Sequence, residues 1–420
     1  MWLLHLQSGL GIAVIIALAW ALSENRRAFP FRTAVAGLAL QFLLAIALLK
    51  IPVARAGLLS LDAVVTALTK ATRAGTAFVF GYVGGARTPF AVTDASELTS
   101  FAFQIFPLVI VISALAALLW HWRVLPVVVN AFAWALRKAL GIGGAVGLGS
   151  AATVFLGMIE APLLIRPYLG RLSRSELFVL FTVGLSTVAG TVFVLYATIL
   201  EPAVPGALGH ILVASLLSLP GGILIARIMM PDGGQTSEQP ADATGALSYR
   251  SSMDAIARGT EDGLKLWLSI VAMLLVIVAL VALVDILLVN FPPLAGEPVT
   301  AERIFGWVFS PVVWLLGLPW REAPDAGALM GQKIVINEFV AYLKLASLPA
   351  GTLDARSRLI MVYAMCGFAN FGSVGILIAG VSSLIPERRD EIVPIAMRAL
   401  ISGTMASCLT GAIIGFLPIT

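Results

Sequence analysis

The sequence predicts an all-α polytopic membrane protein with eight transmembrane helices and two re-entrant helical hairpins in an inverted repeat, together with interfacial helices. Three observations predict this fold class. Hydrophobic residues make up 59% of the 420 residues and charged residues only 12%, whereas about 25% of residues are charged in a typical globular protein. Apolar stretches recur along the whole chain, and Gly-rich stretches interrupt them at matching places in the two halves. A water-soluble protein is therefore excluded.

Eight segments are long and apolar enough to cross a bilayer, which requires roughly 20 residues per helix. They are residues 8–23, 32–49, 102–120, 175–199, 207–228, 265–290, 357–380 and 392–416. Three further segments, 51–75, 124–140 and 300–319, mix apolar and basic residues at helical spacing, which is typical of helices lying along the membrane interface. The polar segment 229–262 is predicted to be a cytoplasmic linker that divides the chain near its middle.

The arginine groups predict the orientation, because Arg and Lys are enriched in cytoplasmic loops. Groups after the first span, before the fourth and before the last fall on one side if the N-terminus is periplasmic; they contain Arg26, Arg27, Arg32, Arg166, Arg171, Arg174, Arg388, Arg389 and Arg398. Eight spans return the C-terminus to the same outer side. The net charge of +4 comes with basic residues at segment ends, so we expect no nucleic-acid partner.

Two apolar segments are too interrupted to be ordinary spans. Residues 141–170 are interrupted by glycines and a proline, with Glu160 among them: Gly141, Gly143, Gly144, Gly147, Gly149, Gly157 and Pro162. Residues 324–350 contain Gly327, Gly331, Lys333, Asn337 and Glu338. Non-helical backbone persists at membrane depth only where protein or a water-filled cavity surrounds it. Both segments are therefore predicted to be re-entrant hairpins.

Each hairpin precedes a span with small and polar residues midway, at 186–191 and at 367–373, and then a further span. The predicted organisation is therefore N-terminal scaffold helices (1–140), a first repeat (141–228), the linker (229–262), a scaffold span with an interfacial helix (263–320) and a second repeat (321–420). The two hairpins enter from opposite faces, so the repeat is inverted. Paired interrupted segments predict a transporter with its site near the bilayer midplane.

Glu160 and Glu338 are the first candidates for that site. A carboxylate at membrane depth costs at least about 2.5 kcal/mol. Two carboxylates at hairpin tips could hold sugar hydroxyls through charge-assisted hydrogen bonds, or exchange a proton. The alternative is a structural ion pair with Arg166 or Lys333.

Asn370 and Ser373 share a face if their segment is helical. The Asn370 amide both donates and accepts, which suits a vicinal diol or an amide edge, although ordinary hydrogen bonding between helices explains it as well. Phe368 could stack on a planar ligand, but packing is the simpler explanation for a phenylalanine in an apolar span.

Thr153, Thr187 and the broken backbone at Val188 could hold a cation, since unwound carbonyls coordinate Na⁺ in transporters. Threonines in membrane helices also bond to their own helix, so this signal is weak. The sequence has no phosphate-binding loop, nucleophile elbow or zinc spacing. We therefore expect no enzyme activity and no cofactor, and transport driven by an ion gradient.

Three motifs are similar to those of the concentrative nucleoside transporters. Residues 157–163 have the sequence GMIEAPL, residues 337–342 the sequence NEFVAY after Gly331 and Lys333, and residues 366–371 the sequence CGFANF before Ser373. The resemblance covers essentially the whole chain. It implies a secondary active transporter of the bacterial inner membrane that imports nucleosides by H⁺ or Na⁺ symport through alternating access. It also implies a homotrimer, in which a mobile transport domain moves against a scaffold in each protomer.

The resemblance assigns roles to individual substrate-site residues. It implies that Glu338 and Asn370 bind the ribose hydroxyls, with help from Ser373. Phe368 would line the base pocket, and Glu160 would contact the substrate directly or through water.

The cation site implied by the resemblance consists of the Thr153 and Thr187 side chains and the Leu156 and Val188 carbonyls. Sodium-coupled members usually have Asn at the position of Thr153, which favours protons slightly. The family also has a polar pair, Gln-Thr or Gln-Ser, where this chain has Met158-Ile159. Apolar contacts discriminate ligands by only about 1–3 kcal/mol, so base selectivity is open.

Two other interpretations stay open. The first is an ion-coupled transporter for another diol-bearing or nucleobase-like solute. The second is a non-transporting membrane receptor or assembly subunit, whose buried carboxylates would be structural.

Overall fold

The computed structural model describes residues 2–92, 98, 100–232, 247–294, 296 and 298–418, without the side chains of residues 55 and 58–62. These residues form helices and loops, with no β-strand among them. Seven helical segments of this part of the chain are long and apolar enough to cross a membrane: Trp2–Ala21, Phe31–Lys50, Phe101–His121, Arg174–Leu200, Ala207–Met229, Ser252–Leu288 and Pro386–Phe416. They coincide with seven of the eight predicted spans, and the eighth, 357–380, is divided into two shorter helices.

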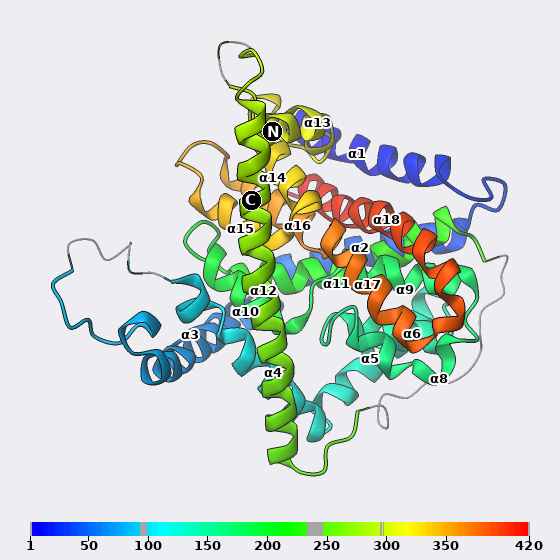
Figure 1. Cartoon of the computed structure of the whole chain (residues 1–420). Helices are drawn as coiled ribbons and strands as arrows, with labels where there is room; N and C mark the ends of the chain where they lie inside the picture. The colour runs from blue at the N-terminus through cyan, green and yellow to red at the C-terminus, as the bar shows by residue number, and fades with distance from the viewer. Residues whose placement is uncertain are drawn as a thin grey trace.

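The helices follow one another along the chain as Figure 1 shows. The N-terminal part contains α1 (Trp2–Ala21), α2 (Phe31–Lys50), α3 (Pro52–Phe80), α4 (Leu108–His121) and α5 (Val124–Leu140). The first repeat contains α6 (Gly144–Thr153), α7 (Glu160–Leu164), α8 (Arg166–Leu169), α9 (Arg174–Ser186), α10 (Gly190–Leu200) and α11 (Ala207–Met229). Then come α12 (Ser252–Leu288), α13 (Ala301–Leu315), α14 (Ala323–Val335), α15 (Glu338–Ser347), α16 (Ala355–Met365), α17 (Phe371–Leu384) and α18 (Arg389–Phe416).

The helices outside the repeats differ from the prediction mainly in their bounds. The helix predicted at 51–75 extends to Phe80 as α3, whereas α5 has the predicted bounds. α12 begins at Ser252, well before the predicted start at 265, so the end of the predicted linker 229–262 is helical. The Ser251 hydroxyl caps this helix by accepting from the Asp254 amide at 3.2 Å, as N-cap serines do. Residues 233–246 of the linker lie outside the described residues.

Both predicted re-entrant segments form helical hairpins. The first consists of α6, a tip around residues 154–159, and the short helices α7 and α8. Its tip contains Gly157 at φ +111°, a left-handed conformation that glycine adopts without steric cost. The second consists of α14 and α15, joined by Ile336 and Asn337.

Each hairpin is followed by a broken span, and the two breaks meet. Residues 187–189 separate α9 from α10, and residues 366–370 separate α16 from α17. The Phe368 amide donates to the Thr187 carbonyl at 3.2 Å. A Cβ at Gly367 would lie 2.8 Å from the Ser186 carbonyl oxygen, so only glycine permits this approach. A backbone hydrogen bond therefore joins the interrupted parts of the two repeats directly.

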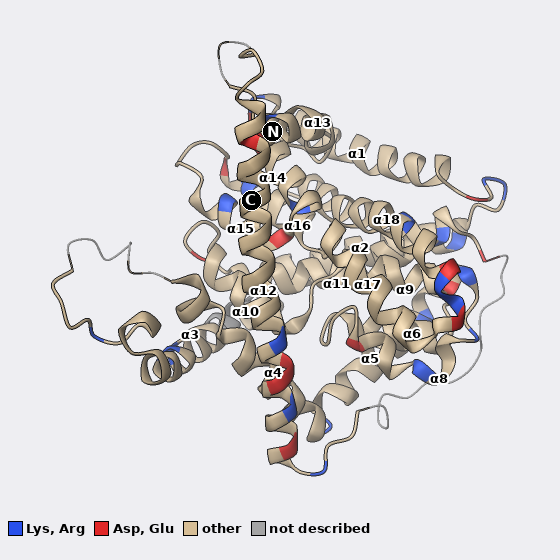
Figure 2. Ribbon diagram, in the orientation of Figure 1, with Lys and Arg blue, Asp and Glu red and all other residues tan. Residues whose placement is uncertain are grey.

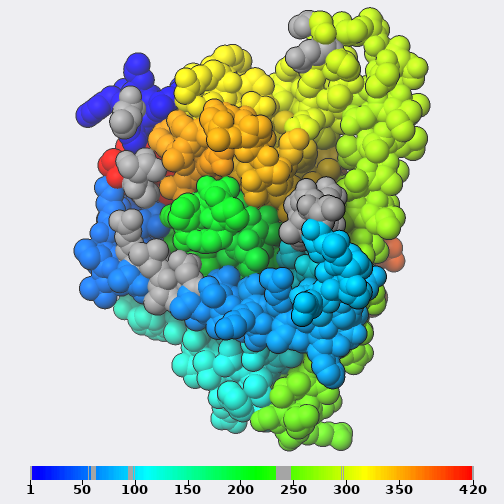
Figure 3. Space-filling model, turned by 90° about the vertical axis from the view of Figure 1, so that its left-hand side faces the viewer, coloured from blue at the N-terminus to red at the C-terminus, as the bar shows by residue number. Residues whose placement is uncertain are grey.

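α12 stands beside the rest of the molecule, upright in Figure 1, and packs along α4. Its buried residues are Ala255, Gly259 and Gly263. A Cβ at Gly263 would lie 2.6 Å from the Ile110 Cα of α4, which explains the close packing. Figure 3 shows α12 as a ridge along one edge of the molecule. Its charged residues lie toward its ends (Figure 2), and residues 266–284 have none, as a membrane-spanning segment requires.

Two polar clusters mark opposite ends of the helical body. At one end Glu24, in the loop after α1, forms ion pairs with Arg174 and Arg398. At the other end His5 lies 3.1 Å from the Gly415 carbonyl, and Arg356 donates to the same carbonyl at 2.6 Å. The first and last helices thus place both chain ends at one face. Cys366 and Cys408 are free and buried.

Candidate functional site

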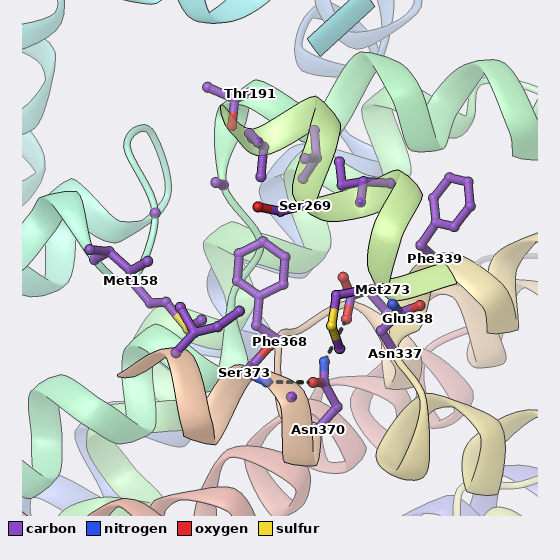
Figure 4. Close-up of a pocket in the computed structure, with 18 of the residues that line it drawn as sticks. Met158, Thr191, Ser269, Met273, Asn337, Glu338, Phe339, Phe368, Asn370 and Ser373 are labelled. Atoms are coloured by element: carbon purple, nitrogen blue, oxygen red, sulfur yellow. Dashed lines mark hydrogen bonds between the residues drawn. The ribbon is translucent and has the colours of Figure 1, made fainter. Parts of the chain in front are cut away.

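A cavity of about 200 Å³ lies between α12 and the interrupted parts of the two repeats. Both hairpin tips, both breaks and one stripe of α12 contribute to its wall (Figure 4). Its lining comprises residues 156–160, 189, 191, 192, 195, 196, 266, 269, 270, 273, 336–339, 368, 370, 372, 373 and 376. All seven residues predicted for substrate binding line this one cavity.

Glu338 has the most constrained position in the cavity wall. The Asn337 side chain caps α15 by accepting from the Val340 amide at 3.0 Å, so Glu338 is the first residue of that helix, where the helix dipole stabilises a negative charge. Tyr196 donates its hydroxyl to Glu338 Oε1 at 2.6 Å, and Asn370 Nδ2 donates to Oε2 at 3.1 Å. Glu338 is only 3% exposed. The carboxylate is thus fixed before any ligand binds, with further lone pairs left to accept hydrogen bonds.

Asn370 connects this carboxylate to the next helix. Its Oδ1 accepts from the Ser373 amide at 2.7 Å, which makes Asn370 the N-cap of α17. The condition for the predicted shared helical face is therefore not met, because Asn370 precedes the helix in an extended conformation (φ −145°). Both residues still line the cavity, and Figure 4 shows Glu338, Asn370 and Ser373 linked in sequence by the two hydrogen bonds.

The opposite part of the wall is apolar. Phe368 is half-buried and stands in the middle of the view in Figure 4, with Met158 on one side and Met273 on the other. Met158 is packed closely, because a Cβ on Gly184 would lie 3.1 Å from its Cβ. Ile159 lies beside it along the tip. A planar apolar group would fit between these side chains, whereas no side chain of the Met158-Ile159 pair can donate a hydrogen bond.

Glu160 differs from Glu338 in its surroundings. It is the first residue of α7, and its side chain is exposed where it lines the cavity. The structure describes no ion pair for it with Arg166. Lys333 likewise does not bond to Glu338, since its Nζ has no hydrogen-bond partner among the described residues. The alternative of structural ion pairs at these two glutamates thus has no support.

Two of the four positions predicted for a cation, Thr153 and Thr187, are neighbours in the structure. The Thr187 hydroxyl oxygen is 3.5 Å from that of Thr153, and both residues are buried. Each hydroxyl also donates to its own helix, Thr153 to the Ser150 carbonyl at 2.7 Å and Thr187 to the Val183 carbonyl at 2.9 Å. Their lone pairs therefore stay available for a cation.

The two positions predicted to bind a cation through their carbonyls, Leu156 and Val188, have different surroundings. The Val188 amide donates to Ser215 Oγ at 3.1 Å, and the Val188 carbonyl accepts from the same hydroxyl at 3.3 Å. Leu156 lies three residues after the end of α6 and also lines the cavity. A cation near these residues would thus lie close to the cavity. No group of three or more His, Cys, Asp or Glu side chains in the described ranges could hold a metal ion.

Sequence reasoning missed two kinds of lining residue, Tyr196 and one stripe of α12. Tyr196 appeared as an ordinary residue of an apolar span, although a lone tyrosine hydroxyl in such a span needs a partner. On α12, Leu266, Ser269, Ile270 and Met273 recur at helical spacing and face the cavity. The serine in this otherwise apolar stripe was the only signal that could have placed α12 at the site.

Comparisons with known proteins agree with this architecture. A family model described as the C-terminus of Na⁺ dependent nucleoside transporters matches residues 210–415, and its N-terminal counterpart matches residues 10–83. A third model, described as nucleoside recognition, matches residues 102–203. The nucleoside permease NupC of Helicobacter pylori is 35% identical over 415 residues, which cover 97% of this chain and 96% of that protein.

Solved structures are similar over the whole chain. CNTnw in an inward-facing substrate-bound state has a TM-score of 0.90 and 32% sequence identity, covering 98% of this chain and 97% of that one. A variant of CNTnw in an outward-facing state has a TM-score of 0.91 and 32% identity, covering 99% of this chain and 98% of that one. The chain therefore belongs to the Na⁺ dependent nucleoside transporter family, whose members are multi-pass membrane transporters and not enzymes.

Proposed function

We propose that this protein imports nucleosides by cation symport through alternating access. The observation that carries the proposal is the Glu338 carboxylate, fixed by Tyr196 and Asn370 at the edge of a cavity that holds Phe368. A carboxylate beside an amide presents acceptors and donors that match a vicinal diol. The aromatic ring opposite matches a planar base. A nucleoside combines these two features in one molecule.

Individual residues would act in the following way. Glu338 accepts hydrogen bonds from the two ribose hydroxyls, while Asn370 orients the carboxylate and Ser373 supports Asn370. Phe368 packs against the base, with Met158 and Ile159 as an apolar wall. Glu160 reaches the substrate directly or through water.

The coupling cation would be H⁺ or Na⁺, held at Thr153, Leu156, Thr187 and Val188. The two hydroxyl oxygens 3.5 Å apart support a cation position. Coupling requires that the cation favour the substrate-binding conformation. Because Leu156 belongs both to this group and to the cavity wall, ordering of the first hairpin tip around a cation would form the substrate site at the same time.

Alternating access would move the repeats against a scaffold that contains α3, α4 and α12. The similarity to CNTnw in both inward-facing and outward-facing states supports such a movement. The apolar side chains exposed on α3 and α12 support contacts with lipid and with partner protomers, and we propose a homotrimer. We place the protein in the bacterial inner membrane, with the Arg174 and Arg398 end in the cytoplasm and both termini in the periplasm.

Uptake of radiolabelled uridine and adenosine into proteoliposomes tests this function. An inward Na⁺ gradient and an inward proton gradient are imposed in separate experiments. Uptake driven by one gradient alone would support nucleoside symport and identify the cation. No uptake of either nucleoside under either gradient would contradict the proposal.

A second candidate function is transport of another diol-bearing solute. The apolar Met158-Ile159 pair favours it, because these side chains cannot read the hydrogen-bonding edge of a base. Competition by free ribose and by unrelated diols distinguishes the two functions. Inhibition by a diol without a base, as strong as inhibition by uridine, would support the second candidate.

A further inference from the structure

The hydroxyl of Ser269 lies in the cavity wall on α12, a helix outside the two repeats. It is the only hydroxyl in residues 266–284, where every other residue is Leu, Ile, Val, Ala, Met or Trp. A hydroxyl in an apolar environment costs free energy unless it has a hydrogen-bond partner. An alanine at this position would avoid that cost, so the serine needs an explanation.

The usual partner of a serine or threonine hydroxyl in a membrane helix is a carbonyl of its own helix. Thr260, earlier on α12, follows this rule and donates to the Ile256 carbonyl at 2.7 Å. The Ser269 hydroxyl makes no hydrogen bond within the part of the chain that the structure describes. Its side chain is exposed where it lines the cavity. The hydroxyl is therefore available to a ligand.

The rotation of α12 that turns Ser269 toward the cavity is fixed from the other side of the helix. The Trp267 indole donates to the Ala102 carbonyl at 2.8 Å, in the segment Phe101–Ile105 that precedes α4. Two positions along a helix correspond to about 200° around its axis, so this bond and the Ser269 side chain lie on opposite sides. The packing of α12 on the segment before α4 thus sets the position of the hydroxyl.

The stripe of α12 that lines the cavity runs from the proposed diol position toward the far side of the aromatic ring. Met273, one turn after Ser269, lies beside the start of α17, because a Cβ at Gly372 would be 3.6 Å from its Cε. Figure 4 shows Ser269 beyond the ring of Phe368 as seen from Asn370. One helical turn corresponds to about 5.4 Å along the axis. A ligand that begins at Asn370 and extends past Phe368 therefore meets Ser269.

We propose that Ser269 binds the hydrogen-bonding edge of the base and so supplies, from α12, the polar contact that Met158 and Ile159 cannot make. The inference rests on the proposed nucleoside function and deepens it. A hydroxyl both donates and accepts, so Ser269 pairs with a ring carbonyl as well as with an amino group. It favours ligands with a polar base over free diols, without selecting among the common bases.

The test compares Ser269→Ala with wild type by calorimetry on the purified protein in detergent, with three ligands that share the ribose. Uridine and cytidine have a hydrogen-bonding edge, whereas phenyl riboside has a benzene ring in place of the base. Loss of one neutral hydrogen bond should weaken uridine and cytidine binding about fivefold each. Binding of phenyl riboside should not change. Ser269→Thr, which keeps the hydroxyl, should recover most of the uridine affinity.

Thr260→Ala is the matched control, because it removes a hydroxyl of the same helix that is bonded to its own backbone. Its affinities for the three ligands should be those of wild type. Equal losses of uridine and phenyl riboside in Ser269→Ala would mean that the residue shapes the cavity without contacting the base edge, which overturns the inference. Unchanged uridine affinity in Ser269→Ala overturns it as well.

Thiol labelling of Ser269→Cys locates the contact independently of affinity. Wild type, in which Cys366 and Cys408 are buried, gives the background rate. Saturating uridine should slow modification of the variant and free ribose should not; an equal rate with and without uridine overturns the inference. Wild type that binds no nucleoside contradicts the proposed function itself. Wild type that binds uridine, together with no effect in either Ser269 variant, contradicts only the inference.

Discussion

The two hairpins place a glutamate at the same position but surround it differently. Glu160 and Glu338 are each the first residue of the helix that follows their hairpin tip. Asn337 caps the helix of Glu338 through its side chain, whereas Ile159 provides no side-chain cap for the helix of Glu160. Glu338 is 3% exposed and holds two side-chain hydrogen bonds. Glu160 is exposed in the cavity.

This difference indicates a division of work between the repeats. The second hairpin presents a carboxylate whose geometry is set in advance, so a ligand hydroxyl that binds there loses little free energy to ordering the site. The first hairpin presents an adaptable carboxylate and an apolar wall beside the predicted cation position. We expect affinity to depend on the second hairpin, and selectivity and ion coupling to depend on the first. The following substitutions test that division.

The largest effect is expected from Glu338→Gln. The substitution removes the charge and turns an amide NH₂ toward either Tyr196 or Asn370, both of which already donate to this side chain. Losing charge-assisted bonds to two ligand hydroxyls, at about 1.5–3 kcal/mol each, should lower uridine binding by roughly 100-fold or more. Binding measured by calorimetry, with size-exclusion chromatography as a folding control, checks this. Binding within twofold of wild type would remove Glu338 from the site.

Tyr196→Phe should have the next largest effect. It deletes the hydroxyl that donates to Glu338 Oε1 at 2.6 Å and leaves the ring in place. A hydrogen bond to a charged group contributes about 1.5–3 kcal/mol, so uridine affinity should fall about tenfold. Tyr342→Phe is the matched control, because its hydroxyl donates to the Val362 carbonyl at 2.9 Å and not to Glu338. Equal losses in the two variants would mean that preorganisation of Glu338 is not the cause.

Met158→Gln combined with Ile159→Thr tests the selectivity assigned to the first hairpin. The change introduces polar groups at the cavity wall, which can pair with the edge of a base. Preferences among uridine, cytidine, adenosine and guanosine should change by about 1–3 kcal/mol, because a base that leaves a buried polar side chain without a partner loses about that much free energy. Competition against labelled uridine measures these preferences. An unchanged order and spacing of the four nucleosides would place the base elsewhere.

The sequence predicted the hairpins and their carboxylates because a carboxylate is costly at membrane depth. The presence of Glu160 and Glu338 there therefore indicates a function. Glycines and prolines at membrane depth are equally informative, because they interrupt a helix where no water can satisfy the backbone hydrogen bonds. The family motifs then indicated Asn370, Ser373 and Phe368. All of these residues line one cavity in the structure.

The sequence could not predict which residues, far away along the chain, contact each site residue. Tyr196 lies 142 positions from Glu338 along the chain, and no spacing rule connects them. α12 faces the cavity through one stripe of its surface, but in the sequence this helix looks like any other apolar span. The face that Asn370 was expected to share with Ser373 depended on both residues being helical, whereas Asn370 caps the helix. Asn is a preferred N-cap residue, but the sequence did not fix where this helix begins.

Glu160→Gln should have the smallest effect on binding and thereby sharpens the comparison with Glu338→Gln. Its side chain is exposed, and interactions of exposed charges are worth about 0.2–1 kcal/mol, so uridine affinity should fall by about twofold to fivefold. Calorimetry on both variants, at the same pH and salt, gives the ratio directly. A loss as large as that of Glu338→Gln would mean that the first hairpin closes around the substrate and buries Glu160 in the bound state. The two carboxylates would then act as equal partners, and the division of work between the repeats would fail.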